Sequence, residues 1–288
     1  MIEKVTVAVD GEAASDAAVA WLIDRAKHVD LSVELTAVIA LNVELPQGRA
    51  AGSRTPYEHA LGTARAEISS AHPRLHVMTN LRHGIVHDEI VAASRRSDLL
   101  VIGSNRPSAL AGMINGTLPL RVAGWAGCTT IVVPAGWTAS TGRVVVGWTD
   151  DGTSDRALQF AAREAVRRQV ELTVVHAWSA PPSGSMVPST PASIVQEIVT
   201  TNRELVADAA QRISREFPEL EVSHSLHSGS ASVAIIRAAA GASLVVIGSR
   251  GRGAIASLIL GSVSHDVLMN MPAVVAVIPR EESPHGAR

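Results

Sequence analysis

A glycine-rich segment in the second half of the chain has the composition of a phosphate-binding loop. It follows the apolar run Leu244–Ile247 and fits the pattern Gly-x2-Gly-x9-Gly-Ser, whose members are Gly248, Gly251, Gly261 and Ser262. Glycines allow backbone N–H groups to approach an anion closely. A Gly-Ser pair at the start of a helix adds a hydroxyl and free amides where the helix dipole favours phosphate. The pattern therefore predicts a phosphate cradle; the alternative is a tight turn that only packing requires.

The position of this segment supports the cradle. An apolar strand, a flexible loop and a helix start follow one another here, and open parallel sheets bind ligands at the carboxyl ends of their strands, where the strand order reverses. The pattern is not a dinucleotide-binding fingerprint, because no Gly-x-Gly-x-x-Gly follows the first strand, and the chain has no Gly-Lys-Ser/Thr.

The chain contains an internal repeat. Residues 81–134 align without a gap with residues 226–279, at a constant offset of 145. The first copy keeps Gly103, Gly116 and Thr117 at the matching spacing, but Arg106 stands where the second copy has Gly251. The repeat predicts two domains, at residues 1–137 and 142–282, that share a fold and differ in their sites.

The first copy's loop should bind phosphate poorly. Arg106 replaces a glycine and so removes the freedom of that position to adopt positive φ, and Pro107 removes an amide donor and stiffens the turn. Two outcomes remain open, because the Arg106 guanidinium either blocks the phosphates or pairs with them. Blockage or weak binding is the preferred interpretation.

Strand-like and helix-like runs alternate along both halves. Helices are expected at 13–27, 57–71, 85–95 and 117–126 in the first half and at 194–217 in the second. The expected strands are 5–9, 33–39, 75–81, 99–102 and 129–133, then 144–148, 170–177, 221–226, 244–247 and 273–278. This alternation predicts an α/β fold of two tandem doubly wound domains, each a five-stranded parallel sheet with helices on both faces.

Composition excludes several classes of protein. The chain has 25 basic and 27 acidic residues without a basic patch, so nucleic acid is not an expected partner. Its one cysteine, Cys128, excludes an internal disulfide and a cysteine metal cluster. No apolar run reaches the roughly 18 residues that a membrane span needs. We therefore expect a cytoplasmic protein that does not engage a membrane.

The glycine pattern and the repeat together resemble the universal stress protein family, in its tandem two-domain form familiar from actinobacteria. The resemblance covers essentially the whole chain and implies the adenine nucleotide alpha hydrolase-like fold and ATP, with Mg²⁺ as an accompanying ion, as the ligand. It further implies nucleotide-binding roles in domain 2 for Thr149, Asp151, Ala177, Gly248, Arg250, Gly251, Gly261, Ser262 and Val263.

The resemblance places an acid at the end of each first strand, and the two halves differ there. Asp10 fits in the first half, eight residues before Ala18, whereas the same count from Ala157 leads to Thr149. Either Asp150 or Asp151 reaches the ribose through a register shift, or Thr149 makes a weaker contact. In domain 1 the resemblance assigns the equivalent site to Asp10, Ala40, Gly103, Gly116 and Thr117.

The remaining titratable residues do not form a catalytic group. His83 and His87 are four residues apart but straddle a predicted helix start, so a metal site there is disfavoured, and His176 inside a strand is expected to be a packed core residue. His265 and Asp266 follow Ser262 but are expected to be solvated. No metal site and no enzyme activity are expected, apart from incidental ATP hydrolysis.

The function implied is an ATP-binding, stress-related regulatory protein whose ligand adjusts its interactions with a protein partner. The alternative is a nucleotide-free, dimerising scaffold of the same fold, and a weak ATP hydrolase is a third hypothesis. In this family the last strand often pairs domains or subunits, so we expect a homodimer or a pairing of the two domains. Ala273–Ile278 and Thr129–Val133 are the candidate strands.

Overall fold

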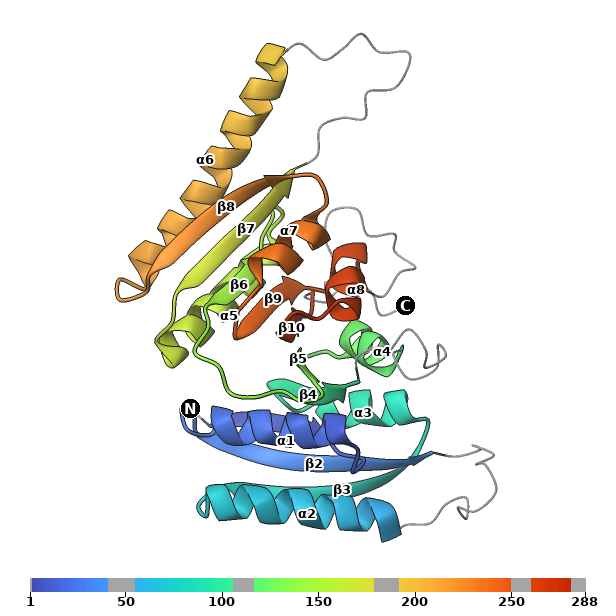
Figure 1. Ribbon diagram of the computed structural model, residues 1–288. Coiled ribbons are helices and arrows are strands. Elements are labelled where there is room, and N and C mark those ends of the chain that lie inside the picture. The colour runs from blue at the N-terminus through green and yellow to red at the C-terminus, as the bar shows by residue number, and fades with distance from the viewer. Residues whose placement is uncertain (1, 41–54, 106–116, 179–191, 250–259, 281–288) are drawn as a thin grey trace. The chain divides into compact units, whose positions relative to one another are not determined.

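The computed structural model describes residues 2–40, 55–105, 117–178, 192–249 and 260–280 (Figure 1). These residues form two compact units. The first unit contains the residues up to Ala139 and the strand from Val274 to Ile278, and the second runs from Ser140 to Ser249 and from Gly261 to Ala273. Each unit is described by itself below.

The first unit is an α/β layer structure whose sheet has the strand order β3-β2-β1-β4-β5-β10. All its strands are parallel except β10, which runs antiparallel to β5. Its elements are β1 (Glu3–Ala8), α1 (Ala13–Arg25), β2 (Leu31–Ala40), α2 (Thr55–Ala71), β3 (His76–Gly84), α3 (Val86–Ser94), β4 (Leu99–Ser104), α4 (Thr117–Trp125), β5 (Thr129–Pro134) and β10 (Val274–Ile278).

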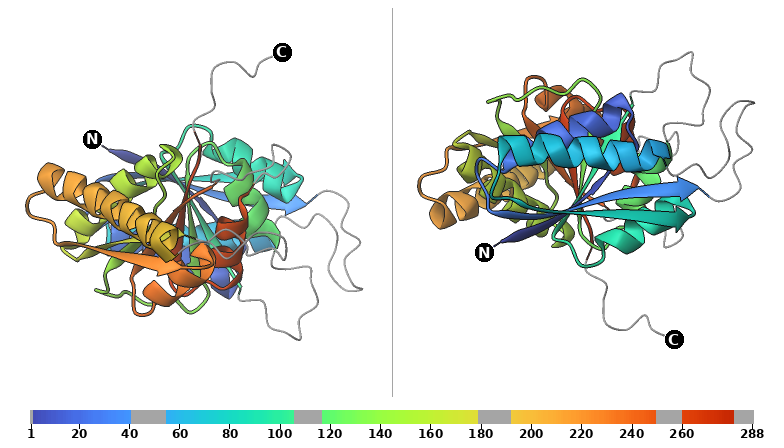
Figure 2. Two further views of the ribbon diagram at one scale, coloured as in Figure 1. Left: turned by 90° about the horizontal axis from the view of Figure 1, so that it is seen from above. Right: turned by 90° about the horizontal axis from the view of Figure 1, so that it is seen from below.

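The second unit repeats this order, with parallel strands arranged β9-β6-β7-β8. Its longest helix, α6, packs along β8, as α2 packs along β3 in the first unit (Figure 2). Its elements are β6 (Val144–Gly147), α5 (Thr153–Arg168), β7 (Leu172–Trp178), α6 (Ala192–Glu216), β8 (Val222–Ser228), α7 (Ala231–Ala238), β9 (Leu244–Gly248) and α8 (Ser262–Met269).

The core of each unit consists of aliphatic strands buried on both faces. Val144, Val145 and Val146 are consecutive and fully buried in β6, as Leu244, Val245 and Val246 are in β9. Continuous apolar runs of this kind are typical of parallel strands with helices on both sides. The predicted tandem α/β fold is confirmed, with element ends that differ by a few residues from those expected. The expected five parallel strands per domain become six and four, because β10 joins the first unit and runs antiparallel to β5.

The last strand belongs to the first unit. β10 pairs with β5 in antiparallel register, with Val275 opposite Val132 and Val277 opposite Thr130. The expected pairing of Ala273–Ile278 with Thr129–Val133 is therefore confirmed. Residues 130–133 of β5 are fully buried, so β10 covers a sheet edge that would otherwise expose unpaired backbone groups.

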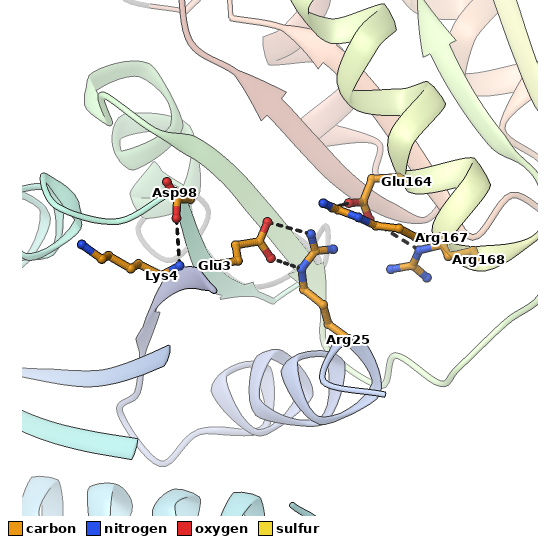
Figure 3. Close-up of polar contacts among 7 residues, drawn as sticks. All are labelled: Glu3, Lys4, Arg25, Asp98, Glu164, Arg167 and Arg168. Atoms are coloured by element: carbon orange, nitrogen blue, oxygen red, sulfur yellow. Dashed lines mark hydrogen bonds and ion pairs between the residues drawn. The ribbon is translucent and has the colours of Figure 1, made fainter. Parts of the chain in front are cut away.

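Ionic contacts hold the helices that follow the first strand of each unit (Figure 3). Arg25 on α1 contacts Glu3 on β1 through two bonds of 2.7 and 3.0 Å and lies over the ring of Trp21. In the second unit, the fully buried Glu164 on α5 accepts a 2.8 Å bond from Arg167. Counted from Ala18 and Ala157, positions 25 and 164 are equivalent, so the two units carry opposite charges at the same buried helix position.

No helix within the described residues has both the length and the apolar character needed to cross a bilayer.

Candidate functional site

The candidate site lies at the carboxyl edge of β6, where the strand order of the second unit reverses. The chain passes from β6 to β7 and β8 on one side and returns to β9 on the other. Val144 pairs with Leu172 and with Leu244, and these constant spacings, continued along the strands, bring Thr149 level with Ala177 and Ser249. In a parallel α/β sheet this is the position at which a ligand binds.

Two hydrogen bonds join the end of β9 to the start of α8. The Gly261 N–H donates to the Ser249 carbonyl at 2.8 Å, and the Ser264 hydroxyl donates to the Gly248 carbonyl at 2.6 Å. Gly261 is the N-cap of α8, and the first intrahelical bond runs from the His265 N–H to the Gly261 carbonyl. The N–H groups of the first turn therefore start beside the carboxyl end of β9, without intrahelical acceptors.

The residues of the glycine pattern divide into two groups. Gly248, Gly261, Ser262 and Val263 are brought together by the β9–α8 junction, and Ser262 is exposed there. Arg250 and Gly251 lie outside the described residues, as do Gly116, Arg106 and Pro107 of the first copy. Thr117 begins α4, at the position that Ser262 has in α8.

Thr149 occupies the position that Asp10 has in the first unit. The Val9 N–H donates to the Thr36 carbonyl and the Trp148 N–H donates to the Val175 carbonyl, both at 2.9 Å and both across 27 residues. The residues after Val9 and Trp148 are therefore equivalent. The two strand ends have the same register, so the backbone shows no shift that would put Asp150 or Asp151 in the place of Asp10.

Asp151 faces the start of α5. Its Oδ1 accepts hydrogen bonds from the Ser154 N–H at 3.3 Å and from the Ser154 hydroxyl at 3.4 Å. A carboxylate at this place satisfies an amide of the first helical turn and is favoured by the helix dipole. Asp10 also bonds locally, accepting from the Glu12 N–H at 2.9 Å, but its side chain is exposed.

In the first unit, the strand register makes Val38, and not the expected Ala40, the equivalent of Ala177. β1 and β2 are paired at the same spacing as β6 and β7, so Val38 is level with Asp10 as Ala177 is level with Thr149. Ala40 lies two residues further along β2, at its end.

The packing of β4 against α1 is enough to explain why residue 103 is a glycine. A Cβ atom at this position would overlap the backbone carbonyl of Ala14, at the start of α1. The close approach of β4 to α1 therefore requires glycine whether or not a phosphate binds. The glycine that the first copy retains here is consequently not an indication of a working site.

His176 is a buried core residue, as predicted, and its contacts extend to the candidate site. Its Nδ1 lies 3.0 Å from the Trp148 carbonyl oxygen, and its Nε2 lies 2.9 Å from Oδ1 of Asn202 on α6. The rings of His176 and Trp148 meet edge to face, 5.7 Å between centroids. Sequence analysis missed Trp148 and Asn202, because a contact between β6, β7 and α6 leaves no local spacing signal.

The two units differ in charge between the helices next to the site. His87 on α3 contacts Arg121 on α4 at 3.0 Å, and the equivalent residues of the second unit, Ser232 on α7 and Asp266 on α8, are joined by a 2.9 Å hydrogen bond. His87 also lies 2.9 Å from Asp88. His83 takes no part in these contacts, and no group of three metal-ligating side chains was found within the described residues.

Comparison with known proteins identifies the family. The profile of the universal stress protein family matches residues 1–134 and again residues 141–279. A universal stress protein of Mycolicibacterium smegmatis is 28% identical over 286 residues, covering 95% of this chain and 96% of the relative. One from Mycobacterium tuberculosis is 29% identical over 294 residues, covering 94% and 96%.

A solved structure shows the same fold. The crystal structure of a universal stress protein from Archaeoglobus fulgidus aligns with a TM-score of 0.69 at 19% identity, over 96% of this chain and 98% of that one. The two family matches together span nearly all of the chain, and each contains one copy of the repeat. The chain therefore belongs to the universal stress protein family and carries two Usp domains in tandem.

Proposed function

We propose that the second domain binds an adenine nucleotide, ATP with Mg²⁺, and that the bound state alters the interaction of this protein with a partner in the cytoplasm. The observation that supports this most directly is the β9–α8 junction. The hydrogen bond from Gly261 to Ser249 holds the first turn of α8 at the edge where the strand order reverses. Free amides at that edge are suited to phosphate.

We propose the other contacts of the nucleotide from the family resemblance together with the register. The family resemblance assigns the backbone of Ala177 to the adenine and the position of Thr149 to the ribose, and the register agrees in that it places the two residues level with each other. The Thr149 hydroxyl would then replace a carboxylate at the ribose. A neutral hydroxyl forms a weaker hydrogen bond than a carboxylate does. We therefore propose that Thr149 contacts the nucleotide and that Asp151, bonded to Ser154, supports α5 instead.

The proposed role is not catalytic. The described side chains at this edge are Thr149, Ser262 and the Asp266–Ser232 pair, and they place no histidine between a hydroxyl and a carboxylate, because Ser232 donates directly to Asp266. Under this proposal ATP turnover stays at the level of the buffer, and a steady-state phosphate-release assay checks it.

The first domain is proposed to bind nucleotide weakly or not at all. Its glycine pattern is interrupted by Arg106, and the remaining Gly103 is required by α1. A second candidate function, a nucleotide-free interaction module, is favoured by Thr149 in the place of the acid.

Thermal unfolding with and without Mg-ATP tests the proposal. A ligand at about 100 times its Kd stabilises the folded state by about 2.7 kcal/mol. This stabilisation should raise the Tm of the wild type and of the variant Arg106→Gly when Mg-ATP is added. Mg-ATP should not raise the Tm of Gly251→Arg, whose ligand-free Tm should equal that of the wild type. Equal stabilisation of Gly251→Arg, or none in the wild type, would reject nucleotide binding by the second domain.

A further inference from the structure

A carboxylate and a hydroxyl join the two helices that begin beside the proposed phosphate site. Oδ2 of Asp266 on α8 accepts a 2.9 Å hydrogen bond from the hydroxyl of Ser232 on α7. Ser232 is buried, and its hydroxyl lies 2.9 Å from that of Ser230, the N-cap residue of α7. Among the described residues, Oδ1 of Asp266 contacts only Nδ1 of His265, at 3.6 Å, and the Asp266 side chain is 53% exposed. One oxygen of this carboxylate is therefore held, and the other has room for a further ligand.

The fold places the Asp266 carboxylate at the carboxyl edge of the sheet. The Gly229 N–H donates to the Trp178 carbonyl at 2.8 Å, so α7 begins beside the end of β7. Helix α8 begins beside the end of β9, where its first turn would hold the phosphates under the proposed function. Asp266 follows Ser262 by four residues, and side chains four apart on a helix lie on one face with about 5–6 Å between their Cβ atoms. Ser232, in the first turn of α7, keeps the carboxylate level with that edge.

A carboxylate alone at this place would oppose the binding of a nucleotide. Phosphates are negatively charged, and like charges a few ångströms apart repel each other. A divalent cation between them reverses the effect. Mg²⁺, which the family resemblance implies, is usually bound through one or two carboxylates together with the phosphates of a substrate, and it keeps several water ligands. The donors gathered here are the Asp266 carboxylate and the hydroxyls of Ser230 and Ser232, all of them oxygen, so the donor set fits Mg²⁺.

The first domain carries the opposite charge at the same place. At the constant offset of 145, Asp266 corresponds to Arg121 and Ser232 corresponds to His87, and these two residues also meet, at 3.0 Å. A guanidinium pairs with phosphate directly and has no lone pair to offer a metal ion. Because both domains join the two helices with side chains of opposite charge, helix packing does not by itself require an acid at position 266.

We propose that Asp266, positioned by Ser232, binds the Mg²⁺ that accompanies the nucleotide in the second domain. Asp266 would supply one oxygen ligand, and phosphate oxygens and water would complete the coordination. This inference rests on the proposed function and refines it. Because Mg²⁺ bridges β- and γ-phosphate oxygens, the ligand is a nucleoside triphosphate or diphosphate and not a monophosphate.

Calorimetric titration of the nucleotide-stripped full chain with ATP, in excess Mg²⁺ or in excess EDTA, tests the proposal. The gain from Mg²⁺ is the ratio of the Kd in EDTA to the Kd in Mg²⁺. For the wild type we expect a gain of about tenfold or more, the effect of one charge-assisted contact. AMP should show no such gain, because it lacks the β- and γ-phosphates.

Two substitutions at Asp266 separate metal binding from the helix contact. Asp266→Asn should reduce the gain to about threefold or less, since only a neutral contact remains, and its amide oxygen still accepts the bond from Ser232. Asp266→Arg copies the charge of Arg121. It should bind ATP in EDTA about tenfold more tightly than the wild type does, with no gain from Mg²⁺.

Two further variants test the positioning role and the effect of charge alone. Ser232→Ala should lower the gain by about threefold, the effect of one neutral hydrogen bond, without changing the affinity for ATP in EDTA. Asp208→Asn is the matched control, because it removes an exposed carboxylate from α6 and should keep the gain of the wild type.

A gain in Asp266→Asn equal to that of the wild type would overturn the inference, because the pair would then serve only to join α7 and α8. An equal gain for AMP and ATP, or an equal loss in Asp208→Asn, would overturn it as well. If ATP binds in EDTA and Mg²⁺ adds nothing, the inference fails and nucleotide binding by the second domain stands. If ATP binds under neither condition, the proposed function fails and the inference fails with it.

Discussion

Val275, in the last strand, lies opposite Val132 of β5, and both side chains are fully buried. The antiparallel ladder between them completes the first unit with a strand that comes from the end of the second copy of the repeat. An edge strand that lacked this cover would expose a row of unpaired N–H and C=O groups. The stability of β5 therefore depends on residues more than a hundred positions away.

A charge in the middle of β10 should loosen β5. Ala276 is fully buried opposite Ile131, so Ala276→Asp buries an unpaired carboxylate and should cost about 3 kcal/mol or more in unfolding free energy. Urea unfolding and amide exchange of residues 130–133 measure the effect. Ala20→Asp, on the exposed side of α1, should cost less than about 1 kcal/mol. Unchanged exchange in β5 would contradict the pairing.

Gly103 should not tolerate a methyl group. Gly103→Ala forces β4 away from the Ala14 carbonyl and should destabilise the protein by about 1–3 kcal/mol. Gly62 is the matched control, because it is exposed in α2 with open space at its Cβ position, and Gly62→Ala should raise stability by about 0.5–1 kcal/mol. Thermal unfolding without ligand measures both. Equal effects of the two substitutions would refute a packing requirement at Gly103.

The buried pair of Arg25 and Glu3 should contribute more to stability than an exposed pair at the C-terminal end of α1. Arg25 is 2% exposed, so Glu3→Gln removes a charged acceptor from a buried guanidinium and should cost about 1–3 kcal/mol. Lys27 contacts Asp24 at 3.0 Å but is 58% exposed, and Lys27→Gln should change stability by less than about 1 kcal/mol. Similar losses in urea unfolding for the two variants would show that burial does not set the difference.

Cys128 should react slowly in the folded protein. Burial raises the pKa of its thiol from 9.0 to about 11, although a contact with Ser94 opposes the shift. At pH 9 about 1% of the folded thiol but about half of the unfolded thiol is ionised, which predicts about 50-fold slower alkylation by iodoacetamide in the native state. A rate equal to that of urea-unfolded protein would contradict the raised pKa.

The raised pKa of Cys128 also predicts how the free energy of unfolding changes with pH. The unfolded thiol loses its proton first as the pH rises from about 9 to about 11, so unfolding becomes easier across that window. Cys128→Ser removes this contribution and should flatten the loss of stability there.

The sequence was sufficient to predict the ten strands and the tandem fold, because aliphatic strand runs and the 145-residue offset are visible without a structure. It also identified Ala273–Ile278 as a pairing strand, because the segment is apolar enough to be buried between other strands. What it could not decide depends on register and on contacts across the fold. The equivalence of Thr149 and Asp10 needed the strand pairing.

Two residues show the limit most clearly. The pattern that includes Gly103 suggested phosphate binding, but the approach of α1 requires that glycine for packing, and the spacing alone cannot separate the two causes. His176 was assigned to the core by its strand, yet its partner Asn202 lies on a helix 26 residues later. Contacts of this kind are set by packing between layers and not by local periodicity.

The measurement that most directly tests nucleotide binding by the second domain is calorimetric titration of the nucleotide-stripped, full-length protein with Mg-ATP. We predict one site per chain, lost in Gly251→Arg and kept in Arg106→Gly. Two sites per chain in the wild type would contradict the interpretation of Arg106, and the absence of any binding would contradict the proposed function itself.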